Sequence, residues 1–399
     1  MKEKWVVSAK KADFQAIGQH FGIDPVLARI MRNRGLTDLQ EMNLYLHGTR
    51  TDLNDPHLLK DADLAAQILR EKIKEKKRIR IIGDYDIDGI QSTYILYCAL
   101  RRLGADADFV IPDRILDGYG LNEHLVTRAS QDGIDTILTC DNGISAIDQI
   151  HLAKSLGMTV VVTDHHEVPF TEVDGVRKEK VCEADAVVNP KQQACHYPFK
   201  KLCGAAVAFK LVQVLYEVFG LEVSEADCFI ENAGFATVGD VMDLQGENRI
   251  LVKLGLEMLN RTTNIGMKAL ILQNKLTMGA IKSHDIGFRI GPCLNASGRL
   301  DTARLSLKLL LCESEAEAAV LAEEIVELNE SRKLLTMHAV EQAKEIAQQE
   351  EYVNDRVLVI FLPDCHESLA GIVAGRIREV YYRPTLVVTR SEHGAKGSG

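Results

Sequence analysis

The chain has 399 residues, of which 46% are hydrophobic and 26% charged, and its formal net charge at pH 7 is −10. This length predicts two or three domains, and the composition is typical of a globular, cytoplasmic protein without membrane-spanning helices. The nine cysteines form no CxxC pair, which argues against a disulfide framework and a structural zinc site. The acidic balance disfavours a general nucleic-acid binder, although acidic metal ligands can coexist with cations confined to a groove.

Residues 1–77 are predicted to form an N-terminal helical extension. Asp24 followed by Pro25 is a helix start signal, and apolar residues at helical spacing come after it. A turn at Asp55 and Pro56 then leads into a helix that continues through Ile73. The extension is therefore expected to consist of short helices joined by turns.

Residues 78–190 alternate between apolar runs that suit strands and patterns that suit helices. The expected strands are 79–82, 107–111, 136–140, 159–163 and 186–189, and the expected helices include 92–103 and 144–156. Apolar strands that alternate with helices predict an α/β fold with a parallel sheet covered by helices on both faces. In such sheets ligands bind outside the carboxyl ends of the strands.

Three aspartates, Asp84, Asp86 and Asp88, directly follow the first predicted strand. If this segment is extended, residues spaced two apart point the same way, so three carboxylates crowd onto one side of the backbone. Crowded carboxylates raise one another's pKa unless a cation neutralises them, and a divalent metal held by oxygen ligands is the usual solution. The alternative is a polar turn that happens to be acidic.

Polar residues also follow the other strands of the predicted sheet. Arg114 comes after the second strand and Asp141 after the third, and the fourth is followed by Asp164, His165 and His166. An isolated pair of adjacent histidines is usually a surface feature. Three acidic or histidine clusters at one edge of one sheet are much harder to assign to chance.

After Pro190 the chain is predicted to be mainly helical. Asp240 stands in an otherwise apolar segment, where a carboxylate is costly unless it is capped, paired or metal-bound. It is therefore a further ligand candidate, with a helix cap as the alternative. Residues 287–300 are predicted to form a glycine-rich loop whose backbone N–H groups, with Arg299, could hold an anion.

The last quarter of the chain is predicted to contain a connecting helix and a second, smaller α/β unit. The predicted domains are the extension, a catalytic domain over 78–312, the connecting helix over 313–353 and the smaller unit over 354–399. In the smaller unit we expect strands at 357–362 and 385–389, a helix at 369–380, and a terminal glycine-rich basic loop. Because this unit lacks a partner layer, we expect the natural protein to continue beyond residue 399.

These segments together resemble the DHH phosphoesterase superfamily and, within it, the RecJ single-strand exonucleases. The superfamily is named for the Asp-His-His that stands here as Asp164, His165 and His166. The resemblance covers nearly the whole chain, and its ordered motifs are 83–89, 141–143, 164–166, 197–200 with 204–210, 239–240, 295–299, 366–367 with 371–376, and 396–399. It implies that residues 354–399 form an incomplete DHHA1-type domain.

The resemblance implies a site for two metal ions, manganese or magnesium. Carried over residue by residue, Asp86 is expected to bind one ion, and Asp88, His165 and Asp240 the other, with Asp141 bridging the two. Two such ions can lower the pKa of a shared water and stabilise charge on the attacking and leaving oxygens. Carboxylates and imidazole, rather than a nucleophilic side chain, are then the residues that the chemistry needs.

Further roles are implied around this site. His166 is expected to face the scissile phosphate, and Asp164 is expected to orient the histidines. The expected catalytic residues are therefore His166, Asp164 and Asp141. The chain departs from many superfamily members at Ile82, where they have a histidine. One ion is therefore expected to have fewer protein ligands, or to recruit Asp84 and water.

The resemblance also implies a substrate and a reaction. Arg114, Arg299 and Arg376, with Ser398, are expected to hold phosphates in a cleft that admits one strand. The expected activity is 5′-to-3′ exonuclease hydrolysis of single-stranded DNA in repair and recombination, by a monomer whose partners are a single-strand-binding protein and a helicase. The alternatives are a DHH phosphodiesterase of short oligonucleotides or cyclic dinucleotides, and a non-catalytic nucleic-acid-binding scaffold.

Overall fold

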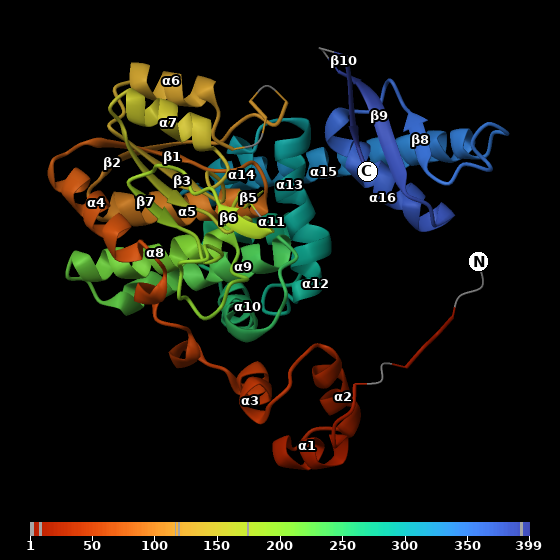
Figure 1. The fold of residues 1–399 in the computed structure, drawn as a ribbon, viewed down its shortest axis with the longest axis horizontal. Helices are drawn as coiled ribbons and strands as arrows, with labels where there is room; N and C mark the ends of the chain where they lie inside the picture. Colours follow the sequence, from red (N-terminus) through yellow and green to blue (C-terminus); the bar gives the residue numbers. More distant parts are fainter. Residues whose placement is uncertain (1–3, 8–9, 116, 119, 174, 392–393) are drawn as a thin grey trace.

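A computed structural model describes residues 4–7, 10–115, 117–118, 120–173, 175–391 and 394–399. A five-stranded parallel sheet lies at the centre, with strand order β2-β1-β3-β4-β7 (Figure 1). Its strands are β1 (Arg78–Ile82), β2 (Asp106–Val110), β3 (Thr136–Cys140), β4 (Thr159–Thr163) and β7 (Ala186–Val188). The predicted parallel sheet is therefore confirmed.

Helices cover both faces of this sheet because successive residues of each strand alternate between two apolar cores. Ile81 and Val161 pack against one set of helices, whereas Ile82 and Val162 pack against the other. The first set is α4 (Ala62–Lys74), α5 (Ile87–Arg102) and α8 (Gly204–Val218), and the second is α6 (Glu123–Gln131) and α7 (Ile147–Ser155). Strands that are buried on both faces explain the near-continuous apolar runs in the sequence.

The segment with the three aspartates differs from the prediction. Helix α5 begins at Ile87, five residues before the expected start at Ser92, and Asp86 is its N-cap residue. The Asp86 side chain accepts hydrogen bonds from the backbone N–H groups of Asp88 and Gly89, which stabilise the first helical turn. The expectation of one extended segment with three parallel side chains is therefore wrong.

A helical layer follows the sheet. It contains 3-10 turns at Val223–Phe229 and the helices α9 (Ile230–Gly239), α10 (Gly246–Leu259), α11 (Ile265–Gln273), α12 (Ser283–Asp285), α13 (Gly291–Leu300) and α14 (Arg304–Leu310). Residues 287–300, predicted as a glycine-rich loop, are instead helical: a π-helical turn spans Ile286–Ile290 and continues into α13. Since Ile290, Cys293 and Leu294 are buried, apolar burial outweighed the weak helix propensity of the glycines.

The C-terminal unit joins the sheet domain through the long helix α15 (Glu315–Ala347), as predicted for the connecting helix. Its sheet has the order β10-β9-β8, formed by β8 (Leu358–Phe361), β9 (Thr385–Ser391) and β10 (Gly394–Ser398), with a 3-10 turn at Glu367–Leu369 before α16 (Ala370–Tyr381). The core contains Ala343 of α15, Ile360, Val373 and Val387. The basic loop expected at the end of the chain is wrong for residues 394–398, which pair antiparallel with β9.

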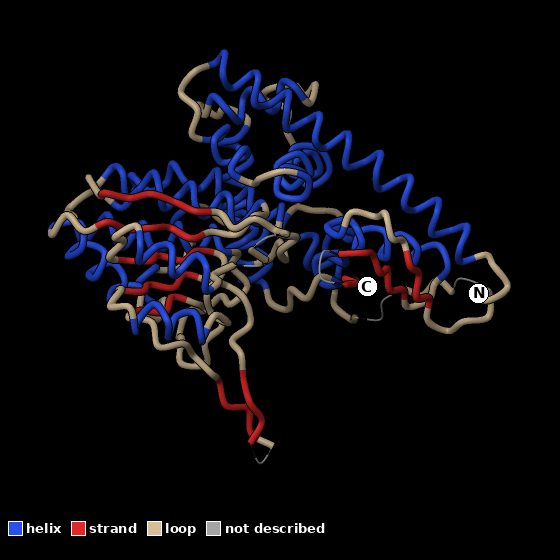
Figure 2. The backbone as a smooth tube through the Cα atoms, turned by 90° about the horizontal axis from the view of Figure 1, so that it is seen from above, coloured by secondary structure: helices blue, strands red, loops and turns tan. Residues whose placement is uncertain are grey.

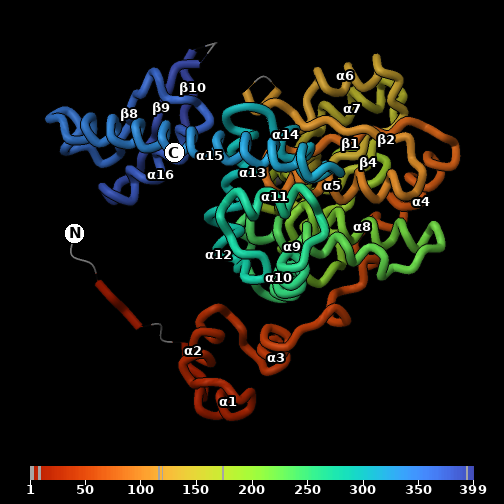
Figure 3. The backbone as a smooth tube through the Cα atoms, turned by 180° about the vertical axis from the view of Figure 1, so that it is seen from behind, coloured from red at the N-terminus to blue at the C-terminus, as the bar shows by residue number. Residues whose placement is uncertain are grey.

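The N-terminal helices are α1 (Phe14–Phe21), α2 (Pro25–Asn33) and α3 (Leu39–His47), followed by 3-10 turns at Arg50–Asp52 and Pro56–Leu58. Asp24 caps α2 by accepting from the Val26 N–H, which confirms the predicted start. These helices have a small core of their own around Met31 and Met42 and lie below the sheet domain in Figure 3. They contact that domain through α10, whose Arg249 and Lys253 donate to the carbonyls of Tyr45 and Leu46.

An unpredicted hairpin follows β4. Its strands, β5 (Phe170–Val173) and β6 (Val176–Glu179), form a separate two-stranded sheet that projects from the body of the molecule (Figure 2). Among the helices within the described residues, none combines the length and the apolar character needed to cross a membrane. The predicted domain boundaries remain a prediction.

Candidate metal centre

Two aspartates of the first motif, Asp86 and Asp88, accept hydrogen bonds from the amino ends of two helices. Asp86 Oδ1 accepts from the N–H groups of Asp88 (2.9 Å) and Gly89 (3.1 Å) at the start of α5. Asp88 is buried, and its two oxygens accept from the N–H groups of Gly204 (2.6 Å) and Ala205 (2.7 Å) at the start of α8. Helix amino ends stabilise anions, so the backbone holds both carboxylates in fixed orientations.

Asp141 follows β3 and faces the same space. It is buried, and its backbone has a φ of 61°, a left-handed conformation that turns the chain sharply at the strand end. Gly204 makes this approach possible, because a Cβ at that position would lie 2.7 Å from Asp141 Cβ. Burial, and next the charge of Asp88, raise the pKa of Asp141 well above its usual range.

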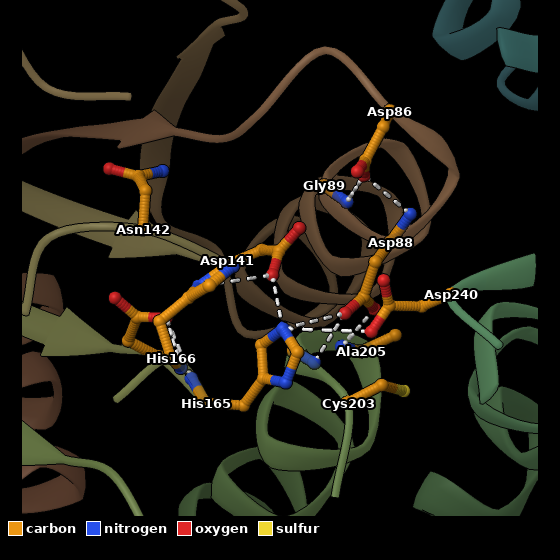
Figure 4. Close-up of polar contacts among 12 residues, drawn as sticks. Asp86, Asp88, Gly89, Asp141, Asn142, His165, His166, Cys203, Ala205 and Asp240 are labelled. Carbon is orange, nitrogen blue, oxygen red and sulfur yellow. Dashed lines mark hydrogen bonds and ion pairs between the residues drawn. The ribbon is translucent and has the colours of Figure 1, made fainter. Parts of the chain in front are cut away.

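The His165 ring lies close to three carboxylates. Its Nε2 lies 3.0 Å from Asp141 Oδ1, 3.5 Å from Asp88 Oδ2 and 3.8 Å from Asp240 Oδ2 (Figure 4). Burial lowers the pKa of His165, which favours the neutral imidazole that ligates metals. Asp240 directly follows α9. Burial, and next the charge of Asp88, raise the pKa of Asp240 to about 7.

Asp164 organises the segment that carries the histidines. It is buried and accepts from the N–H groups of Ile144, His165 and His166 and from Nδ1 of the His166 ring, at 2.7 Å. Burial alone would raise the pKa of Asp164. The hydrogen bonds outweigh this effect, first among them that of the His166 ring, and hold the pKa of Asp164 below its usual value. The same contact raises the pKa of His166 against the opposing effect of burial.

Asp84 is buried, like Asp88, whereas Asp86 is only partly buried. Burial and the charge of Asp86 raise its pKa to about 8, and Oδ1 accepts no hydrogen bond from any described residue. Ile82, where many superfamily members have a histidine, is buried in the core beneath the sheet. The structure thus places Asp84, and not residue 82, beside Asp86 and Asp141.

The donor atoms form three overlapping groups in which all members lie within 4.8 Å of one another. The groups are Asp84 with Asp86 and Asp141, Asp88 with His165 and Asp240, and Asp141 with His165 and His166. Buried carboxylates with raised pKa values need protons or cations, and carboxylate oxygens with one neutral imidazole suit Mn²⁺ or Mg²⁺. The residues therefore fit divalent cations, and Asp141 belongs to two of the three groups.

The predicted phosphate-binding residues are only partly brought together. Tyr85, Arg114, Arg299 and Ser398 line a cavity of about 550 Å³ between the sheet domain and the C-terminal unit. The Arg114 guanidinium lies 4.7 Å from the centre of the Tyr85 ring, and Arg299 Nη1 donates to the Ser368 carbonyl. Arg376 is exposed on α16 and is not among the residues that line this cavity, so its expected role in holding phosphates remains a prediction.

Two features of the site were not predicted from the sequence. One is the amino end of α8, whose N–H groups hold Asp88; the sequence indicated residues 204–210 only as part of a motif of the resemblance. The other is Lys396, which lines the same cavity and pairs with Glu367 at 2.9 Å. A glycine at a helix start was the available signal for the first, and the motif 396–399 was the signal for the second.

Comparisons with known proteins identify the family of this chain. The family model described as the DHH family, N-terminal domain, matches residues 78–232. A single-stranded-DNA-specific exonuclease RecJ of Bacillus subtilis is 35% identical over 400 residues, which cover all of this chain and 49% of the relative. The chain thus spans about half the length of that relative, and 66% of the RecJ of Escherichia coli, with which it is 32% identical.

Solved structures extend the likeness to the fold. A crystal structure of exonuclease RecJ bound to manganese is 34% identical, with a TM-score of 0.73 over 83% of this chain and 80% of that one. RecJ of Thermus thermophilus in complex with Mn²⁺ is 30% identical, with a TM-score of 0.75 over 94% of this chain and 52% of that one.

Fold and site together define an α/β protein with a carboxylate–histidine centre at the carboxyl edge of a parallel sheet. This arrangement suits the binding of divalent cations. The chain belongs to the DHH family and, within it, to the RecJ group.

Proposed function

We propose that this protein is a metal-dependent exonuclease that hydrolyses single-stranded DNA from the 5′ end in repair and recombination. The observation that carries the proposal is the convergence of Asp86, Asp88, Asp141, His165 and Asp240 within the overlapping groups of donor atoms. A relative that had become a non-catalytic scaffold would have no need to keep this set intact. The names and bound metals of the RecJ relatives support the same activity.

The ligands are proposed to divide between two Mn²⁺ or Mg²⁺ ions. Asp86 and Asp84 belong to one ion, Asp88, His165 and Asp240 to the other, and Asp141 to both. When bound, the two ions supply a water of lowered pKa and stabilise charge on the oxygens of the scissile phosphodiester. The helix amino ends hold the carboxylates in place before any ion binds, so little reorganisation is needed.

The surrounding residues are proposed to orient the substrate. Asp164 holds His166 in a fixed orientation and favours its protonated form, which can donate a hydrogen bond to a phosphate oxygen. Arg114 and Arg299, with Ser398, provide donors for phosphates of the strand in the cavity between the two units. Arg376, exposed on α16 and not among the lining residues of this cavity, is proposed as a further donor for a phosphate of the strand. We further propose a cytoplasmic monomer that acts with a single-strand-binding protein and a helicase.

A substrate comparison tests the proposed function. With Mn²⁺, we expect rapid release of nucleotides from a long single strand with a 5′ phosphate, and at least tenfold slower hydrolysis of a blunt duplex and of a dinucleotide. The measurement is the rate of acid-soluble nucleotide release from matched end-labelled substrates. Hydrolysis of the dinucleotide alone would favour a phosphodiesterase of short oligonucleotides and refute the proposal.

Gly204→Ala is expected to weaken both Mn²⁺ binding and hydrolysis by about 10- to 100-fold, the range typical of residues that support metal ligands. The added Cβ would meet Asp141 Cβ at 2.7 Å and Asp141 Oδ1 at 2.8 Å, so that carboxylate must move. Calorimetric titration with Mn²⁺ and the nucleotide-release rate measure the two effects.

Gly375→Ala is the matched control for this substitution. It lies within α16, and a Cβ there would meet no atom within 4 Å. This variant should keep normal Mn²⁺ affinity and gain roughly 0.5–1 kcal/mol of stability, because alanine is the better helix former. Equal Mn²⁺ affinity in the Gly204 variant and the wild type would contradict the proposed packing against Asp141.

A further inference from the structure

The β5–β6 hairpin stands beside the candidate metal centre. Strand β4 ends at Thr163, the two histidines follow, and β5 begins only four residues after His166, at Phe170. The base of the hairpin is fixed to the body, because Val168 is buried and the Glu179 carboxylate accepts from the Gln193 N–H. From this base the hairpin extends away from the sheet edge (Figure 2).

The hairpin exposes apolar side chains that no core covers. Phe170 is 52% exposed and Val176 is 66% exposed. The Phe170 ring is stacked by the guanidinium of Arg177, 4.1 Å from the ring centre, and Arg177 Nη2 also donates to the Val168 carbonyl. An isolated two-stranded hairpin is at best marginally stable in water, so an arm of this kind has little structural value unless a ligand contacts it.

The charges of the arm indicate the chemistry of that ligand. The pairing register places Phe170 and Arg177 on one face, and Thr171 with Lys178 on the other. Lys180 continues the second face, since its N–H bonds to the Pro169 carbonyl. Neither Lys178 nor Lys180 forms an ion pair with any carboxylate of the described residues, and both are exposed. The second face therefore presents two lysines, whereas Glu172 and Glu179 share the face of Phe170 and Arg177.

We propose that the β5–β6 hairpin is a nucleic-acid contact arm that binds the DNA strand outside the metal centre, a role that rests on the proposed exonuclease function. Lys178 and Lys180 contact phosphates, and the platform of Phe170 and Arg177 stacks against a base. Lysines on one face of a narrow arm and an exposed aromatic ring on the other suit a single strand that passes around the arm, because its phosphates and bases are both accessible. The arm lengthens the binding site beyond the nucleotide that is hydrolysed.

Binding without hydrolysis tests the arm independently of the nuclease activity. In EDTA, with a fluorescent oligothymidylate of about 20 nucleotides, we expect Lys178→Glu combined with Lys180→Glu to raise the Kd about tenfold or more. Loss of two phosphate contacts should also reduce the slope of log K against log salt by about 1.4, because each contact to a single strand contributes about 0.7. Phe170→Ala should raise the Kd about tenfold with little change in this slope, because stacking is not ionic.

The control carries the same charge change at the opposite edge of the sheet. Lys74 is the last residue of α4 and Lys76 lies between α4 and β1, and both are exposed. Lys74→Glu combined with Lys76→Glu should change the Kd only slightly and should leave the salt slope unchanged. An equal effect of the two double variants would show a long-range charge effect and overturn the proposal.

Substrate length separates failure of the arm from failure of the proposed function. The hairpin variants should hydrolyse a trinucleotide at the wild-type rate and lose activity only on long strands, whereas a protein that is not a nuclease hydrolyses neither. If the hairpin variants bound the 20-nucleotide strand with wild-type affinity, the proposed DNA-binding role of the hairpin would be refuted, whether or not the protein hydrolyses DNA. Lys178→Gln with Lys180→Gln adds no repulsion and should show a smaller change in the same direction.

Discussion

Asp141→Asn is expected to lower Mn²⁺-dependent hydrolysis by about 10³-fold while leaving the fold intact. Asp141 is the only residue proposed to contact both ions, and it belongs to two of the three groups of donor atoms. Metal-ion stabilisation of the transition state contributes several kcal/mol, and about 4 kcal/mol corresponds to about 10³-fold in rate.

Asparagine is chosen because it preserves the backbone. Asp141 has a φ of 61°, a left-handed conformation that asparagine adopts more readily than alanine does. The substitution also removes one charge from a crowded, buried set, so the metal-free variant should melt at the same temperature as the wild type or higher. Rate, Mn²⁺ affinity and melting temperature are the three measurements.

Asp243→Asn is the matched control, since it removes the same charge from an exposed carboxylate that pairs with Lys201. It should retain wild-type turnover and Mn²⁺ affinity. If Asp141→Asn retained turnover, or lost it only in proportion to unfolding, the ligand assignment would be wrong.

The metal-free protein is expected to lose stability as the pH rises from about 5 to about 8. The pKa values of Asp84 and Asp240 in the folded state are about 8 and about 7, well above the ordinary value of 3.8. Over this range the folded state therefore binds protons that the unfolded state has released. For each proton that only the folded state binds, the free energy of unfolding falls by about 1.4 kcal/mol when the pH rises by one unit.

Divalent cations should reverse this trend. Mn²⁺ replaces the protons as the neutralising charge, so the increase in melting temperature on adding Mn²⁺ should be larger at pH 8 than at pH 6. Thermal melts at a series of pH values, with EDTA or with Mn²⁺, measure the effect. Asp84→Asn should flatten the pH dependence in EDTA, and stability that rises with pH between 5 and 8 would contradict the raised pKa values.

Much of the fold could be predicted because local patterns and the tertiary structure agree. Each of the five apolar runs became a strand of the parallel sheet, and the glutamate-rich segment became α15. The prediction was wrong where glycine suggested a loop, at 287–300 and 394–398. In the first, buried neighbours favoured a helix, and in the second, the unpaired edge of β9 favoured a strand. These are tertiary effects that no local propensity reports.

The sequence by itself determined the types of ligand and the edge at which they meet. Parallel strands end side by side, so the residues that follow β1, β3 and β4 converge wherever such a sheet forms. The resemblance predicted that Asp88, His165 and Asp240 act together, but only the tertiary structure showed the packing that brings the donors to one place. Asp240 arrives from a distant helix, the amino end of α8 holds Asp88, and Asp84 lies beside Asp86 and Asp141. These arrangements depend on packing between segments far apart in the chain, and the resulting burial raises the pKa values that make the site require cations.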